Sequence, residues 1–117
     1  MTADEDVTLL TQDAYYLAVF APDTAPEDCL AHPDPRGCQF AITLCKDGRA
    51  AERIGDIISS GTYELNGSVA HVAVDNYSFE FDVATRVRSS DSPKTTWVLD
   101  TKDLHKTFNF DTIDCTR

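Results

Sequence analysis

The side chains of this 117-residue chain that could do chemistry are four cysteines, three histidines and twenty carboxylates. A nucleophilic centre needs a nucleophile, a base and an orienting group within reach, and no serine stands in a G-x-S-x-G motif. The histidines, His32, His71 and His105, are dispersed and form no metal-binding motif. His71 stands between Ala70 and Val72 on a predicted strand, where a histidine is usually structural. We therefore expect no enzyme activity, no cofactor and no metal site.

Two groups of carboxylates could bind a partner. Glu80 and Asp82 stand two residues apart, so on a strand their side chains share one face. Such a pair could act in glycoside hydrolysis, although an ordinary outward acidic face explains it equally well. The second group lies in a proline-rich acidic loop, and a loop held rigid by a disulfide loses little entropy on binding. The partner-binding hypothesis rests on Asp23, Glu27, Asp28, Asp34, Glu80 and Asp82.

The four cysteines are Cys29, Cys38, Cys45 and Cys115, and they form no C-x-x-C motif. An even number in a short chain indicates two disulfides, although four reduced, buried thiols remain the competing interpretation. A bridge between Cys38 and Cys45 is disfavoured, because residues seven apart on a strand point to opposite faces. Spacing favours Cys29–Cys38 with Cys45–Cys115, and the alternative is Cys29–Cys45 with Cys38–Cys115.

The charge of the chain restricts the kinds of partner it can bind. The formal net charge is −10 and the isoelectric point is about 4.4. Nucleic acids and anionic membrane surfaces require a basic footprint, so neither is expected as a partner. No lysine or arginine precedes Arg36, and the acidic excess is concentrated in the first third of the chain. A basic protein is the partner that this distribution favours.

Disulfides indicate an oxidising compartment, so we expect a periplasmic or secreted protein. Met1 is followed by Thr2, Ala3 and the acidic run Asp4-Glu5-Asp6 and not by a basic and then apolar signal peptide, which predicts that the sequence starts at the mature chain. A lipid anchor attached before residue 1 is compatible with this interpretation. No stretch approaches the roughly 20 apolar residues of a membrane span, so no direct span is expected.

Alternating apolar and polar residues predict a chain made mostly of strands. The clearest pattern has Tyr77, Phe79, Phe81 and Val83 on one face. Four prolines within residues 21–37 predict an irregular loop there. Strands are predicted over residues 14–20, 38–45, 62–65, 68–74, 77–83, 95–100 and 106–111.

Turn signals separate these strands. Asp47-Gly48 lies within a predicted turn at residues 46–49, Asn66-Gly67 predicts a type I′ turn, and Asp75-Asn76 predicts another turn. Residues 50–60 are ambiguous between a short helical turn and an irregular strand. We predict an acidic N-terminal segment, residues 1–12, and a single β domain, residues 13–117. The domain is expected to be an antiparallel barrel or sandwich of seven to eight strands, held by disulfides and carrying the Pro-rich loop.

Two segments also carry a resemblance to known proteins. They are Phe40-Ala41-Ile42-Thr43-Leu44 with Asp47-Gly48-Arg49, and the run from Gly61 to Val69. They resemble the turn and strand patterns of small bacterial envelope proteins with lipocalin-like or META-like β-barrels. The resemblance covers about a third of the chain, and its motifs are mostly turn residues. It implies a fold and not a function.

Three functions are compatible with these features. The first is an acidic inhibitor or immunity protein that blocks a basic enzyme or toxin, such as a cell-wall hydrolase. The second is a small-molecule or lipid binder. The third is a structural accessory domain of the envelope. The pocket of the second would be lined by Tyr63, Tyr77, Phe79, Trp97 and Phe108.

Overall fold

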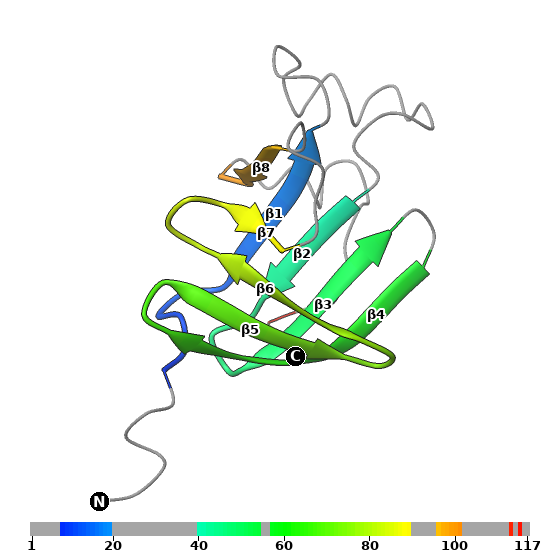
Figure 1. Ribbon diagram of the computed structural model, residues 1–117, viewed down its shortest axis with the longest axis horizontal. Coiled ribbons are helices and arrows are strands. Elements are labelled where there is room, and N and C mark those ends of the chain that lie inside the picture. Colours follow the sequence, from blue (N-terminus) through cyan, green and yellow to red (C-terminus); the bar gives the residue numbers. More distant parts are fainter. Residues whose placement is uncertain are drawn as a thin grey trace, which may run out of the picture.

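The protein folds as one antiparallel sheet that curls into a nearly closed barrel (Figure 1). The computed structural model describes residues 8–19, 40–54, 57–89, 96–101, 113 and 115. Within these residues the sheet order is β7-β6-β5-β4-β3-β2-β1-β8. The predicted all-β class and strand number are therefore confirmed. The strands are β1 (Ala14–Val19), β2 (Phe40–Leu44), β3 (Arg49–Ile54), β4 (Ile57–Asn66), β5 (Val69–Val74), β6 (Ser78–Asp82), β7 (Val87–Arg88) and β8 (Thr96–Leu99).

The turn predicted at residues 46–49 joins β2 to β3. Gly48 takes a φ of 97°, a left-handed conformation that glycine adopts without a steric penalty. The Asp47 carboxylate accepts a hydrogen bond from the Arg49 backbone N–H at 3.1 Å. This bond holds the pKa of Asp47 below its ordinary value, opposed by partial desolvation and helped by the Arg49 side chain. Local turn chemistry therefore fixes this hairpin.

The ambiguous residues 50–60 form a second hairpin, made by β3 and the first part of β4. Ile54 pairs with Ile57, so the two strands continue the sheet across this segment. β4 is consequently longer than predicted, because it begins at Ile57 and not at Thr62. Cross-strand pairing, which the sequence pattern did not reveal, decides this segment in favour of strand.

The next turn falls one residue later than predicted. Asn66 pairs with Val69, so Gly67 and Ser68 are the two central residues. Gly67 has a φ of 64°, whereas Ser68 does not have a positive φ. A positive φ at the first central position alone is the signature of a type II′ turn. The type I′ prediction centred on Asn66-Gly67 is therefore wrong.

The inward faces of the strands form the hydrophobic core. Tyr16 and Phe81 have ring centroids 4.7 Å apart, and Phe81 meets Trp97 edge-on at 5.9 Å. These contacts bring β6, which lies next to one end of the sheet, against β1 and β8 at the other end. The core residues are Ala14, Tyr16, Ala18, Ile42, Leu44, Ala50, Tyr63, Leu65, Ala70, Val72, Phe79, Phe81 and Trp97.

The outward face of β1, β2 and β3 is also buried in part. Leu17, Ala41 and Ala51 point away from the core but are shielded from solvent. Cys115 lies on this side, because its disulfide partner Cys45 directly follows β2. Cys115 is thus tied to the outside of the barrel.

Two predicted segments lie outside the described residues. They are the proline-rich loop at residues 21–37 and the strand predicted at residues 106–111. At the other end of the chain, Thr8 pairs with Leu65, and Leu9 and Leu10 pack against the core. The last residues of the acidic N-terminal segment therefore contact the barrel.

Candidate functional site

The outward side of β4, β5 and β6 carries a row of ionisable side chains, which we call the acidic face: Glu64, His71, Glu80 and Asp82. Antiparallel pairing sets Glu64 opposite His71, and His71 opposite Glu80. His71 Nδ1 lies 3.0 Å from Glu80 Oε2. The His71 and Glu80 side chains are 47% and 58% exposed, so both are accessible to a partner. Strand alternation places these residues together, as predicted for Glu80 and Asp82.

Asp82 has a structural role in addition to its place on the acidic face. Its carboxylate accepts hydrogen bonds from the backbone N–H groups of Ala84 at 2.9 Å and Thr85 at 3.1 Å. The Thr85 N–H is the main cause of an Asp82 pKa below its ordinary value, opposed by partial desolvation and helped by Ala84 and Ser68. Asp82 therefore remains an anion well into the acidic range while it shapes the turn before β7.

Two shallow open hollows lie beside the acidic face. Ser89 borders both of them, and its hydroxyl accepts a hydrogen bond from the Glu80 backbone N–H at 2.9 Å. The first, of about 320 Å³, is lined by His71, Val72, Ala73, Ser78, Phe79, Glu80 and Ser89. The second, of about 310 Å³, is lined by Val69, Glu80, Asp82, Thr85, Val87 and Ser89. Glu80 contributes to both, so both hollows adjoin the acidic face.

Most of the residues proposed for a ligand pocket belong to the core. Tyr63, Phe79 and Trp97 are buried, and Tyr77 is partly exposed. The Tyr63 hydroxyl donates to the Cys45 carbonyl at 2.7 Å and accepts from the Leu10 N–H at 3.1 Å. These contacts fix the ring in the barrel interior. Phe108, the fifth residue of the set, lies outside the described residues.

A buried ion pair crosses the barrel interior, and sequence analysis did not find it. Glu52 on β3 is only 2% exposed. Arg88 on β7 donates from Nε to Glu52 Oε2 at 2.5 Å and from Nη2 to Oε1 at 2.9 Å. The Tyr77 hydroxyl donates to Oε1 at 2.6 Å, and the Arg88 guanidinium stacks 4.3 Å from the centre of the Phe79 ring. Three hydrogen bonds thus compensate the buried carboxylate.

The environment of this ion pair changes the ionisation of Tyr77. Burial is the largest cause of the raised Tyr77 pKa, and the hydrogen bond to Glu52 and its negative charge add to the effect. Ser59 and Arg88 act in the opposite direction. The alternation of β3 could have placed Glu52 inward beside Ala50, but only if residues 50–60 had been assigned to a strand.

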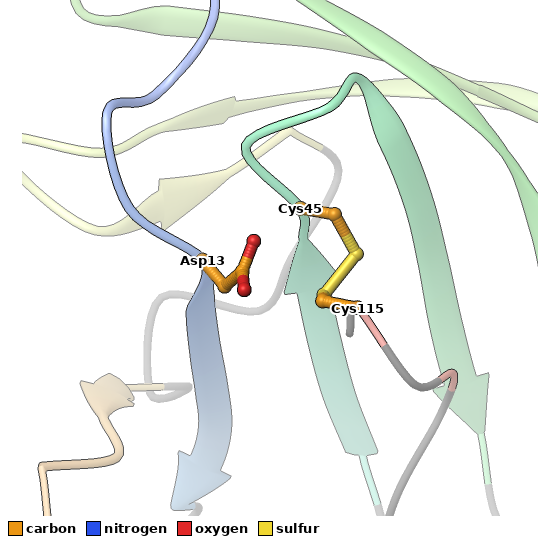
Figure 2. A group of neighbouring side chains, drawn as sticks. All are labelled: Asp13, Cys45 and Cys115. Carbon is orange, nitrogen blue, oxygen red and sulfur yellow. A yellow bond between two sulfur atoms is a disulfide. The ribbon is translucent and has the colours of Figure 1, made fainter. Parts of the chain in front are cut away.

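A disulfide joins Cys45 to Cys115 and confirms that part of the favoured pairing. Figure 2 shows the carboxylate of Asp13 beside this bridge, and ligand atoms of the three residues lie within 4.8 Å of one another. The two sulfur atoms are bonded to each other, and Asp13 accepts a hydrogen bond from the Lys46 N–H at 2.8 Å. This group is therefore a covalent staple and not a set of thiolate ligands.

The remaining predicted site residues lie outside the described residues. They are the loop carboxylates Asp23, Glu27, Asp28 and Asp34, and the cysteines Cys29 and Cys38. The acidic face is thus the described portion of the predicted partner-binding set, extended by Glu64 and His71. Strand pairing, which adds both residues to the row, could not be read from the spacing of Glu80 and Asp82 alone.

The chain matches no known protein family, no curated protein and no solved structure. Within the described residues, no helix is long and apolar enough to cross a membrane.

Proposed function

We propose that this protein is an acidic inhibitor or immunity protein that binds and blocks a basic enzyme or toxin of the cell-wall hydrolase type. The single observation that carries the proposal is the acidic face. Its carboxylates lie on paired strands, where neighbouring side chains are held in register. A rigid, pre-organised charged surface loses little entropy on binding and steers an oppositely charged partner toward it.

The sequence around the acidic face strengthens its negative field. No lysine or arginine occurs between Arg53 and Arg86, a segment that contains β4, β5 and β6. The acidic residues of this segment are Asp56, Glu64, Asp75, Glu80 and Asp82. Because β4, β5 and β6 carry no lysine or arginine that could neutralise this negative charge, a basic cleft is its natural complement.

The barrel interior supports binding at the surface over binding inside. Tyr63, Phe79 and Trp97 fill the core, and Glu52 is already satisfied by Arg88 and Tyr77. An internal ligand would have to displace these contacts. Export to the periplasm or the extracellular space fits the Cys45–Cys115 bridge, because disulfides persist in oxidising compartments.

The test is an inhibition assay against a panel of basic peptidoglycan hydrolases, lysozyme among them, and basic secreted toxins. We expect one of them to lose activity at a one-to-one ratio, with an affinity that falls as salt rises. The double variant Glu64→Gln/Glu80→Gln should slow association by about tenfold, because exposed charges act mainly on the association rate.

Asp47→Asn is the matched control, because it removes an exposed carboxylate that lies outside the acidic face. It should leave the association rate nearly unchanged. Binding that does not depend on salt, or equal effects of the two kinds of variant, would contradict the proposal. Activity of every tested enzyme and toxin in the presence of excess protein would do the same.

A further inference from the structure

β4 has an open backbone edge over its first four residues. The strand is ten residues long, but β5 pairs with it only from Gly61 to Asn66. Figure 1 shows the first part of β4 at the margin of the sheet, next to β3 and beyond the end of β5. Among the described residues, the segment Ile57–Ser60 therefore has a paired strand on one side only.

Alternation of the backbone shows which groups face the open side. The N–H groups of Tyr63 and Leu65 donate to the carbonyls of Gly48 and Thr8, both on the β3 side of β4. Successive residues of a strand direct their backbone groups to opposite sides. The N–H and C=O groups of Ile58 and Ser60 consequently face the open side.

Three isoleucine side chains expose apolar surface at or beside this edge. Ile57 is 70% exposed, Ile58 is 45% exposed, and Ile54 on the paired strand is 40% exposed. They are three of the five large hydrophobic residues exposed in the described part of the chain. Soluble proteins usually protect an edge strand with a charge, a proline or a bulge. Ile57–Ser60 contains neither a charged residue nor a proline, so the segment is suited to pairing with another strand.

We propose that Ile57–Ser59 pairs with the same segment of a second copy of this chain, in an antiparallel, two-fold symmetric dimer. A net charge of −10 makes two copies repel each other over most of their surface, and this edge is an uncharged stretch where the repulsion is smallest. An isologous contact also needs a self-complementary patch, and an antiparallel strand edge meets that requirement.

The end of β5 restricts the register of this dimer. A partner strand that extended opposite Gly61 would collide with Val74, which already pairs there. A two-fold axis through Ile58 keeps the partner strand short of Gly61, because Ile57, where the partner's β4 begins, then lies opposite Ser59. It places Ile58 opposite its own copy and Ile57 opposite Ser59 of the other copy, with facing side chains on the same side of the sheet. The two Ile58 residues then exchange N–H···O=C hydrogen bonds.

Salt distinguishes this contact from the proposed binding of a basic partner. Screening weakens the repulsion between two acidic copies, so dimerisation should become tighter as salt rises. Binding of a basic partner should become weaker over the same range. A chain that does not dimerise would contradict the dimer but not the proposed inhibition. A chain that inhibits no basic enzyme would contradict the proposed function but not the dimer.

The experiment is sedimentation velocity of the full chain over a range of protein and salt concentrations. We expect reversible dimerisation that increases with both. Ile58→Lys places like charges opposite each other and should weaken the dimer about tenfold or more. Val87→Lys is the matched control, because it makes a similar apolar-to-lysine change at an exposed site on β7, and it should leave the dimer intact.

Amide hydrogen exchange tests the same contact without a variant. The Ile58 amide should exchange more slowly as protein concentration rises, whereas the exchange rate of the exposed Gly67 turn should not change. A chain that stays monomeric up to millimolar concentration would overturn the proposal, as would a dimer that Ile58→Lys leaves intact. Protection of Ile58 by the basic partner alone would overturn it in favour of a strand that the partner supplies.

Discussion

At the scale of single residues, the ion pair between Glu52 and Arg88 is the main polar feature of the barrel interior. Arg88 lies on β7, the last strand at one end of the sheet, and reaches across to β3. It therefore links β7 to β3, two strands that do not pair with each other in the sheet. The cost of removing both charges from water is met by the three hydrogen bonds to Glu52 and by stacking on Phe79.

Arg88→Met tests how much the fold depends on this pair. It leaves a carboxylate buried without its cation, so we expect the free energy of unfolding to fall by about 3–5 kcal/mol. The double variant Glu52→Leu/Arg88→Met removes both charges and should regain most of that loss. Urea unfolding of the unmodified protein, the two single variants Glu52→Leu and Arg88→Met, and the double variant measures the coupling free energy between the two residues. A double variant that is less stable than Arg88→Met would contradict the argument.

Tyr77 should make stability depend on alkaline pH. Its pKa is raised in the folded protein, chiefly by burial and also by Glu52, so the unfolded chain releases the phenolic proton first. The stabilisation is complete below the ordinary tyrosine pKa of about 10 and is lost as pH rises through the higher folded value. Tyr77→Phe should make the decline above that pH shallower in urea unfolding. The core residues Tyr16 and Tyr63 also have raised pKa values, so part of the alkaline decline should remain in the variant. A slope of stability against pH that Tyr77→Phe leaves unchanged would contradict a contribution from Tyr77.

At the scale of elements, local signals predicted most strands, and long-range pairing decided the rest. The alternation of Phe79 and Phe81 identified β6, and Asp47-Gly48 identified the first hairpin. The pattern of residues 50–60 did not decide between helix and strand, because short apolar and polar runs fit both. Only their pairing with neighbouring strands makes them β3 and β4. The Asn66-Gly67 error has the same origin, since the register between β4 and β5 sets which two residues become the loop.

Gly61 is required where the backbones of β4 and β5 approach each other closely. A Cβ atom at this position would lie 1.9 Å from the Ala73 carbonyl oxygen, which is backbone and cannot rotate away. Gly61→Ala should force the two strands apart and lower the free energy of unfolding by about 3 kcal/mol or more. Gly67→Ala is the matched control, because its Cβ meets no atom within 4 Å and the change costs only the left-handed φ, about 1 kcal/mol. Equal losses in thermal or urea unfolding would contradict the steric argument.

At the scale of the whole molecule, cysteine spacing predicted one covalent link, whereas the partner and the compartment inferred from charge and cysteine content stay predictions. The Cys45–Cys115 bridge belongs to the favoured of two pairings that spacing left open, and the other bridge of that pairing lies outside the described residues. Glu80 and Asp82 were placed on an outward strand face before any contact was known, but His71 and Glu64 joined them only through strand pairing. The interior pair of Glu52 and Arg88 was not foreseeable, because its partners are 36 residues apart and meet only when the barrel curls.

The bridge between Cys45 and Cys115 should be a large part of the stability of the whole molecule. It joins residues 70 apart, and closing a loop of that length restricts the unfolded chain by about 4 kcal/mol. Cys45→Ala/Cys115→Ala should lower the free energy of unfolding by about that amount, as measured by urea unfolding without reductant. Arg49, which donates to the Cys115 carbonyl at 3.0 Å, would then hold the C-terminal region only weakly. A small chain buries a modest core, so this loss would leave the barrel near its limit of stability. If the double variant unfolded at the same urea concentration as the unmodified protein, the staple would contribute nothing, and closure of the barrel would rest on the core and the ion pair alone.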